Sequence, residues 1–199
     1  MGFQVYDSTG QELQKISGTA GGDLTGTYPN PTLATGVSGL RSIGRQTFTT
    51  ETSKNFPNLF SSSYKNYVLY LAVTASSGNT EITFQLSAAG TAANTNYTTK
   101  RILYSASVAG DSDVRGTDEW AIGYSLSGTP NNRTRVELFS PNEAAATFML
   151  TQGFFAAGAP DYYTVNGSGR HSTATAYDGL TILSSTGTIT GTLDVYGLA

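Results

Sequence analysis

His171 is the only histidine in the 199-residue chain, and the sequence contains no cysteine. A Ser-His-Asp or Cys-His catalytic site would therefore have to be built around this one side chain. The surrounding run, Gly169-Arg170-His171-Ser172, lacks the nucleophile-elbow pattern of hydrolases. A zinc site at His171 would have only carboxylates as further ligands. We therefore expect His171 to be a polar histidine of a strand or loop, and we predict neither a metal nor a cofactor.

Carboxylates are the other groups that could do chemistry, and they are densest in residues 110–119. Asp111 and Asp113 have the alternate spacing that begins a calcium loop. A glycine stands at the sixth position of that pattern, but the twelfth position is Ile122 instead of a carboxylate. A solvated loop with Arg115 as the local counter-charge is therefore the prediction.

Pairs of carboxylates cleave glycosidic bonds when folding brings them to a suitable separation. The candidates are Asp118, Glu119, Glu137, Glu143, Asp161 and Asp178. Their spacing singles out no pair, and a chain of this length has few residues to spare for a substrate cleft. We therefore predict that the protein is not an enzyme, and a glycosidase ranks behind binding and structural functions.

Aromatic side chains are abundant, with 12 tyrosines, 9 phenylalanines and one tryptophan. Aromatic residues beside turns can form a surface that stacks on sugars or docks a protein. The stretch from Gly153 to Tyr163 is the best candidate for an exposed aromatic loop. We predict that Trp120, Phe154, Phe155, Tyr162 and Tyr163 form such a binding surface. The alternative is that each tyrosine is an ordinary strand residue with one side buried and its hydroxyl in water.

The elements that must position these residues follow from the composition. Charged residues make up only 13% of the chain and hydrophobic residues 38%. Ser, Thr, Asn and Gly replace the missing charge, which favours short strands and tight turns over helices. The net charge of −3 offers no broad positive field for phosphate backbones. We therefore expect neither nucleic acid nor membrane insertion, and the start of the chain lacks the features of a secretory signal.

Residues 46–199 contain short apolar or alternating runs separated by turn residues, which is typical of an antiparallel sandwich. We predict an all-β, jelly-roll-like β-sandwich head domain over these residues. The expected strands are Gln46–Thr49, Tyr67–Val73, Glu81–Leu86, Arg101–Val108, Glu119–Leu126, Arg133–Phe139, Thr147–Phe155, His171–Ala176, Leu180–Leu183 and Thr188–Tyr196.

Residues 1–45 differ from the rest. Alternation over residues 3–16 predicts a small hairpin, and residues 17–33 are too rich in Gly and Pro for a helix or a central strand. This second stretch is expected to be an extended, turning connector. Its apolar residues Leu24, Tyr28 and Leu33 are spaced too widely to form a core, so they need a neighbouring subunit to bury them.

The connector carries a family resemblance. Its run Ala20-Gly21-Gly22-Asp23-Leu24-Thr25-Gly26-Thr27-Tyr28-Pro29-Asn30-Pro31-Thr32-Leu33 resembles a segment that recurs in bacteriophage tail-fibre and other virion fibre proteins. The C-terminal run from Tyr177 to Gly197 is similar to the closing strands of β-sandwich modules in phage structural proteins. Together the two matches cover roughly a quarter of the chain.

The resemblance implies a virion-anchoring and oligomerisation segment over residues 1–45 and a distal head over residues 46–199, usually in a homotrimer. The residues to which it assigns association are Leu24, Tyr28, Pro29, Pro31 and Leu33. The implied partners are other virion proteins, through residues 1–45, and a glycan or protein of the host surface.

The expected function is that of a virion structural protein, a short tail fibre or spike subunit that contributes to host attachment. The protein would be made in the host cytoplasm and then reside in the virion. The alternative is a head fibre, decoration or cement protein that holds capsid or tail parts together without binding the host. A host-recognising tail fibre is often much longer, with repeats or a shaft, and the sequence shows neither. A short fibre or spike, a distal tip and a head-decorating fibre therefore stay open.

Overall fold

The computed structural model describes Thr19, Leu24–Thr25, Thr27, Thr32–Leu33 and residues 39–104, 109–112, 118–127, 132–156 and 162–198. The chain divides into two compact units, Met1–Gly39 and Leu40–Ala199. Every regular element of the described residues is a β-strand, and none of them is a helix that could span a membrane. The sequence-based boundary after residue 45 falls inside a strand, so residues 40–45 belong with the second unit.

Fifteen strands, β1 to β15, are described in chain order. Their bounds are Leu24–Thr25, Thr32–Leu33, Leu40–Glu51, Ser53–Phe56, Asn66–Ser76, Thr80–Ala88, Thr91–Ala92, Tyr97–Tyr104, Ala109–Ser112, Trp120–Ser125, Asn132–Phe139, Thr147–Ala156, Tyr162–His171, Gly179–Ser184 and Ile189–Leu198.

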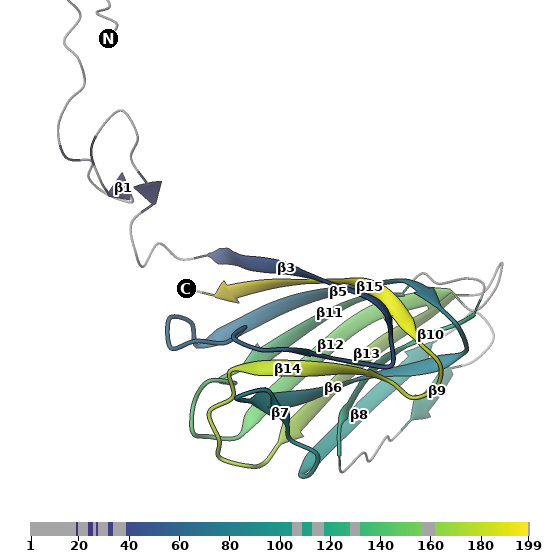
Figure 1. Ribbon diagram of the computed structural model, residues 1–199. Helices are drawn as coiled ribbons and strands as arrows, with labels where there is room; N and C mark the ends of the chain where they lie inside the picture. The colour runs from purple at the N-terminus through teal and green to yellow at the C-terminus, as the bar shows by residue number, and fades with distance from the viewer. Residues whose placement is uncertain are drawn as a thin grey trace, which may run out of the picture. The chain divides into compact units, whose positions relative to one another are not determined.

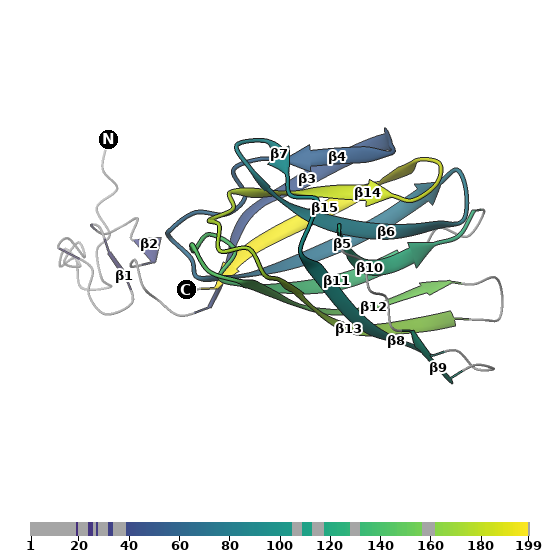
Figure 2. The same cartoon turned by 90° about the horizontal axis from the view of Figure 1, so that it is seen from below.

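The second unit consists of two antiparallel sheets. The larger sheet has eight strands in the order β3-β15-β5-β11-β12-β13-β8-β9, and the smaller has the order β10-β6-β14-β4 with β7 beside β6. Figures 1 and 2 show the smaller sheet lying over one face of the larger. This β-sandwich confirms the predicted all-β fold class, while the jelly-roll detail stays a prediction.

Alternation of side chains along the strands explains how the two sheets pack. In β11, Val136 and Leu138 are buried between the sheets, whereas Arg135 and Glu137 point the other way. Successive side chains of a strand point to opposite faces, so one face joins the core and the other meets water. The strand predicted over residues 133–139 is therefore confirmed.

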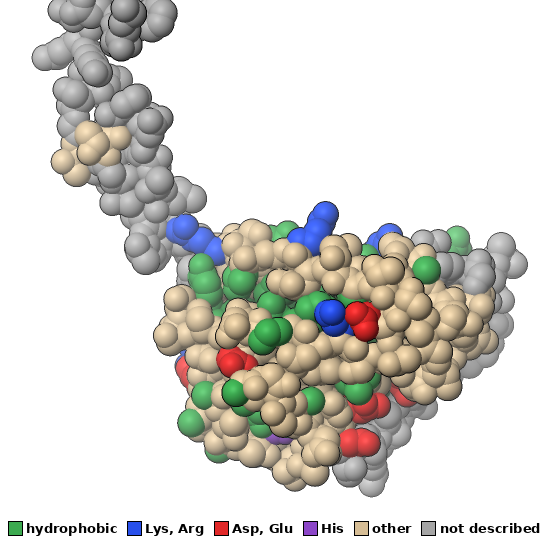
Figure 3. Space-filling view, in the orientation of Figure 1, with side chains coloured by type: hydrophobic (Ala, Val, Ile, Leu, Met, Phe, Trp, Pro, Cys, Tyr) green, Lys and Arg blue, Asp and Glu red, His purple; other side chains and the backbone are tan. Residues whose placement is uncertain are grey.

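The core lies between the sheets and is rich in aromatic residues. Trp120, Tyr67 and Tyr97 are among its largest fully buried side chains. Each buried large apolar side chain contributes roughly 1.5–3 kcal/mol. The face of the sandwich that Figure 3 shows is mostly backbone and uncharged polar groups, with few lysines, arginines or acids.

Strand β13 corrects the predicted strand His171–Ala176. The strand ends at His171 instead of beginning there, and residues 172–178 are not in a strand. Gly167 and Gly169 of β13 are residues typical of a turn, but they lie within this strand. Because they have no side chain, they leave room for side chains of other strands. A Cβ at Gly169 would lie 2.7 Å from the Trp120 ring, and one at Gly167 would lie 2.9 Å from a Thr151 methyl group.

In the first unit, β1 and β2 form a short antiparallel pair in which Leu24 is opposite Leu33. An isolated bridge joins Thr19 to Thr27. The predicted connector therefore contains a small two-stranded element. The predicted hairpin over residues 3–16, and the residues Tyr28, Pro29 and Pro31, lie outside the described part of the chain.

Candidate functional site

Exposed large hydrophobic side chains are confined to one sheet of the sandwich. All ten that occur among the described residues belong to strands of the eight-stranded sheet. They are Leu40, Ile43, Tyr70, Ile102, Tyr104, Phe148, Leu150, Phe154, Tyr162 and Leu198. Single exposed hydrophobics are ordinary, but their concentration on one layer marks a candidate interaction surface.

The face of the eight-stranded sheet that points away from the five-stranded sheet is termed the outer face. The strand register aligns one row of its residues, in which Tyr70 of β5 lies between Asp194 of β15 and Arg135 of β11. The row continues from Arg135 to Gln152 of β12 and Asn166 of β13. Directly opposed side chains lie about 4.5–5.5 Å apart at Cβ, so these groups form a contiguous polar and aromatic strip.

Several contacts hold this strip in place. The rings of Tyr70 and Tyr196 form a T-shaped pair, with centroids 5.8 Å apart and planes at 85°. Arg45 donates two hydrogen bonds to the Asp194 carboxylate, at 2.6 and 3.0 Å. A bidentate guanidinium–carboxylate pair of this kind is directional and fixes both side chains. The exposed Tyr70 ring is therefore braced instead of lying free on the surface.

A hollow of about 680 Å³ opens at this strip, and we call it the arginine hollow. The residues that define it are Arg45, Tyr70, Arg133, Arg135, Phe154 and Asp194. Ala72 and Thr192 also line it. Their short side chains stand in the row next to that of Tyr70, which leaves space between the longer ones.

A second hollow of the same volume lies over β8, β11, β12 and β13, and we call it the apolar hollow. Phe148, Leu150 and Phe139 line it, and the Arg170 guanidinium lies 5.9 Å from the centroid of the Phe148 ring. A third hollow, of about 270 Å³, shares Leu150 with the apolar hollow and Arg135 with the arginine hollow. The third hollow therefore adjoins each of the other two, and we call the three together the furrow of the outer face.

The predicted aromatic surface is only partly on the outside. Phe154 is 45% exposed and Tyr162 is 62% exposed, as a surface residue should be. Trp120 is fully buried and Phe155 is 5% exposed, so their assignment to an exposed surface is wrong. Tyr163 is half-buried and stacks on Phe155 at 5.1 Å. Neighbouring residues of a strand point to opposite faces, which separates Phe154 from Phe155 and Tyr162 from Tyr163.

The outer face also contains residues that the sequence did not single out, above all Tyr70, Arg133 and Arg135. The alternation Arg133-Thr134-Arg135 already indicates that the two arginines share a face. Their position beside Tyr70 depends on the pairing of β5 with β11, strands about sixty residues apart. Local sequence patterns do not reveal such pairing.

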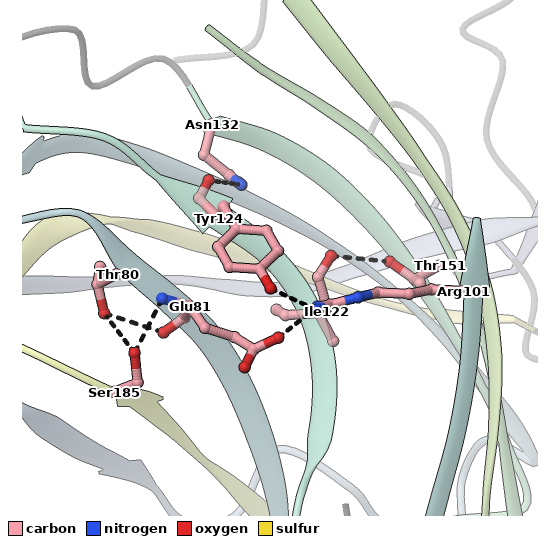
Figure 4. A network of polar contacts seen from close by, with 8 residues as sticks. All are labelled: Thr80, Glu81, Arg101, Ile122, Tyr124, Asn132, Thr151 and Ser185. Carbon is pink, nitrogen blue, oxygen red and sulfur yellow. Dashed lines mark hydrogen bonds and ion pairs between the residues drawn. The ribbon is translucent and has the colours of Figure 1, made fainter. Parts of the chain in front are cut away.

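A polar network crosses the sandwich interior (Figure 4). Arg101 of β8 is 2% exposed, and its guanidinium lies 2.5 Å from the Glu81 carboxylate of β6. It also donates a hydrogen bond to the Tyr124 hydroxyl at 2.6 Å. Burial raises the pKa of Tyr124, and the charge of Arg101 acts in the opposite direction. The network joins the two sheets, so its primary role is structural.

His171 is the last residue of β13, in agreement with the prediction of a strand or loop histidine, and it is 1% exposed, so its ring is buried in the core. Its ring packs against Tyr97, Trp120 and Tyr177, with centroids 4.3, 6.4 and 5.2 Å away. Nδ1 lies 3.4 Å from the Tyr177 hydroxyl. Burial lowers the pKa of His171, against smaller opposing effects from backbone groups of Thr95 and Thr173. The imidazole is a packing element of the aromatic core.

The acidic cluster of residues 110–119 is described only in part. Its beginning belongs to β9, which pairs with β8, and residues 113–117 lie outside the described part of the chain. Among the described residues, no three His, Asp or Glu side chains are grouped so that they could hold a metal ion. The predicted solvated loop with Arg115 stays a prediction.

Comparisons of the chain with protein-family models, curated proteins and solved structures give no match. The function is therefore inferred from the residues of the outer face and of the connector.

Proposed function

We propose that the chain is a structural subunit of a bacteriophage virion, a short tail fibre or spike whose β-sandwich binds the host surface. One observation carries the binding part of this proposal. The exposed large hydrophobic side chains of the described residues all lie on the eight-stranded sheet, and three adjoining hollows lie on its outer face. Concave surfaces with aromatic and a few polar groups are typical binding sites.

The connector supports the virion part of the proposal. Its sequence resembles that of phage fibre proteins, and the structure brings two of its assembly residues, Leu24 and Leu33, to directly opposite positions of one strand pair. In a homotrimer, three such pairs would meet about the axis and bury their leucines between the chains. Residues 1–45 would attach to other virion proteins.

Trimerisation would also strengthen attachment. Three copies of the outer face in each fibre, and several fibres in each particle, raise the overall avidity without a tight single contact. A weak site in an open furrow is sufficient under these conditions.

The purified full chain should compete with phage adsorption to host cells. We expect a Tyr70→Ser/Phe154→Ser variant to need at least about tenfold more protein for the same inhibition, because it removes two exposed rings from the arginine hollow. Ser53→Ala on the five-stranded sheet is the matched control and should compete like the wild type. If the wild-type chain does not reduce adsorption at high concentration, the host-binding proposal is wrong.

The position on the particle is a separate test. An antibody against this chain should label the tail in electron micrographs of intact particles. Label on the capsid shell would contradict the tail-fibre proposal and favour a head fibre, decoration or cement protein.

A further inference from the structure

We propose that the arginine hollow is a subsite for an acidic glycan, a host-surface polysaccharide with carboxylate groups spaced along its chain. This inference rests on the proposed function and names the ligand class of its binding face. Three features of the hollow support it: its positive charge, the exposed rings of Tyr70 and Phe154, and the amide groups of Gln152 and Asn166.

The hollow is positive although the chain is acidic. Its defining residues Arg45, Arg133 and Arg135 bring three positive charges and Asp194 brings one negative charge, which leaves +3 − 1 = +2. Counting Glu137, whose carboxylate lies 2.7 Å from the Arg135 guanidinium, still leaves +1. The whole chain has a net charge of −3. A local positive site on an acidic molecule attracts an anionic group specifically to that place.

The guanidiniums are suited to carboxylates. Arginine presents parallel N–H donors that bind a carboxylate in a bidentate manner, and the Arg45–Asp194 pair shows that geometry in this hollow. Arg133 donates through Nη1 to the backbone oxygen of Asn132 at 2.9 Å, which orients its guanidinium without adding negative charge. A ligand carboxylate can bind here by the same chemistry.

The uncharged groups of the hollow fit the rest of a sugar. Tyr70 is 41% exposed and Phe154 is 45% exposed, so both rings offer an apolar surface to the C–H face of a sugar ring. Gln152 and Asn166 continue the strip from Arg135, and their amides can both donate to and accept from hydroxyls. The volume of about 680 Å³ is that of a small-molecule site.

The net charge of the rest of the chain disfavours binding of a long, dense polyanion such as nucleic acid. Outside the four ionised residues of the hollow, the chain has a net charge of −3 − 2 = −5. That charge repels a closely spaced phosphate backbone. A second copy of this chain is the remaining candidate occupant, and the experiment below separates it from a glycan.

Isothermal titration of the full chain with trigalacturonate, with neutral maltotriose as the matched control, tests the inference. We expect trigalacturonate to bind at least about tenfold more tightly than maltotriose, and its affinity to fall as NaCl is added, because the contact is between exposed charges. Equal affinity for the two sugars, or no detectable binding of trigalacturonate, would overturn the inference.

Two variants locate the site. Arg133→Gln and Tyr70→Ala should each weaken trigalacturonate binding about tenfold or more, whereas Ser53→Ala on the five-stranded sheet should not. Unchanged melting temperatures show that the variants are folded. Unaltered binding by Arg133→Gln would contradict the inference.

Two further measurements distinguish the acidic-glycan subsite from the proposed host-binding function and from self-association of the chain. A wild-type chain that blocks phage adsorption but does not bind trigalacturonate retains the proposed function and loses the acidic-glycan subsite. If light scattering shows that Tyr70→Ala and Arg133→Gln reduce the oligomer mass, the hollow is an interface between copies and the inference is wrong.

Discussion

Arg101 of the eight-stranded sheet and Glu81 of the five-stranded sheet form an ion pair across the sandwich, with 2.5 Å between Nη1 and Oε1. The two partners differ in solvent access, because the Arg101 side chain is 2% exposed and the Glu81 side chain 25% exposed. Removing one partner therefore has a different consequence from removing the other.

Glu81→Gln should lower the free energy of unfolding by about 3 kcal/mol, because the buried guanidinium loses its counter-charge. Arg101→Met should change it by less than about 1 kcal/mol, because an apolar side chain of similar length fills the site and Glu81 still reaches water. Urea denaturation of both variants measures the two values. A larger loss for Arg101→Met than for Glu81→Gln would contradict this account.

The buried imidazole of His171 predicts a pH dependence of stability. Its pKa in the folded state is below the ordinary histidine value of about 6.5, so in the window between these two values the unfolded state binds more protons. Stability should therefore fall as the pH drops from about 6.5 towards the lowered folded pKa.

The carboxyl group of Glu119 acts in the opposite direction, because burial raises its pKa. The decisive quantity is thus the difference between the wild type and His171→Gln. In the wild type, His171 contributes part of the slope of the unfolding free energy against pH. The His171→Gln variant should lack that part. Identical slopes for the two proteins would contradict the assignment.

The turn between β6 and β7 offers a stabilising substitution. Ala89 and Gly90 both have positive φ, 49° and 79°, and Ala88 pairs with Thr91 across a two-residue loop. This is the geometry of a type I′ turn, for which Asn-Gly is the preferred pair. Ala89→Asn should raise the free energy of unfolding by about 0.5–1 kcal/mol in urea denaturation. Ala89→Val, with its branched side chain, should lower it.

Trp120 and Phe154 belonged to one predicted surface, and the structure separates their roles. Trp120→Ala should cost about 3–5 kcal/mol of stability, because it leaves a large cavity against Tyr97. Phe154→Ala should cost less than about 1 kcal/mol but weaken the competition with phage adsorption. Thermal denaturation and the adsorption assay together distinguish them, and a stable, non-binding Trp120→Ala variant would place this ring outside the core.

The strand pair of the connector predicts an effect on assembly alone. Leu24→Asp places a charge directly opposite Leu33 and should reduce the mass of the oligomer in size-exclusion light scattering. Tyr28→Asp is expected to act in the same way from the sequence. The melting of the β-sandwich should not change in either variant. An unchanged oligomer mass would show that the connector is not the assembly element.

Much of the fold was accessible from local patterns. The runs Tyr67–Val73, Glu81–Leu86 and Arg133–Phe139 all lie in observed strands, because β-branched and aromatic residues with a period of two favour strands wherever they occur. Charged residues are scarce, and Ser, Thr, Asn and Gly replace them. This composition predicted short strands and turns with an uncharged polar surface. These are properties of each segment by itself.

Strand β13 shows where local patterns fail. Asn166-Gly167-Ser168-Gly169 has the composition of a turn, yet it lies in the middle of a ten-residue strand. The glycines are there because Trp120 and Thr151 occupy the space that their side chains would need. That requirement comes from other strands, so no local signal contains it.

The candidate site depends on the tertiary structure in the same way. The sequence by itself determined that the chain is all-β, that aromatic side chains are plentiful and that Arg133 and Arg135 share a face. Only the pairing of β15, β5 and β11 brought Asp194, Tyr70 and Arg135 into one row. Trp120 belongs to β10 of the five-stranded sheet, and the packing of that sheet against the larger one buries its ring in the core. A strand's own residues set its period, whereas the register between distant strands is set by the packing of the whole sandwich.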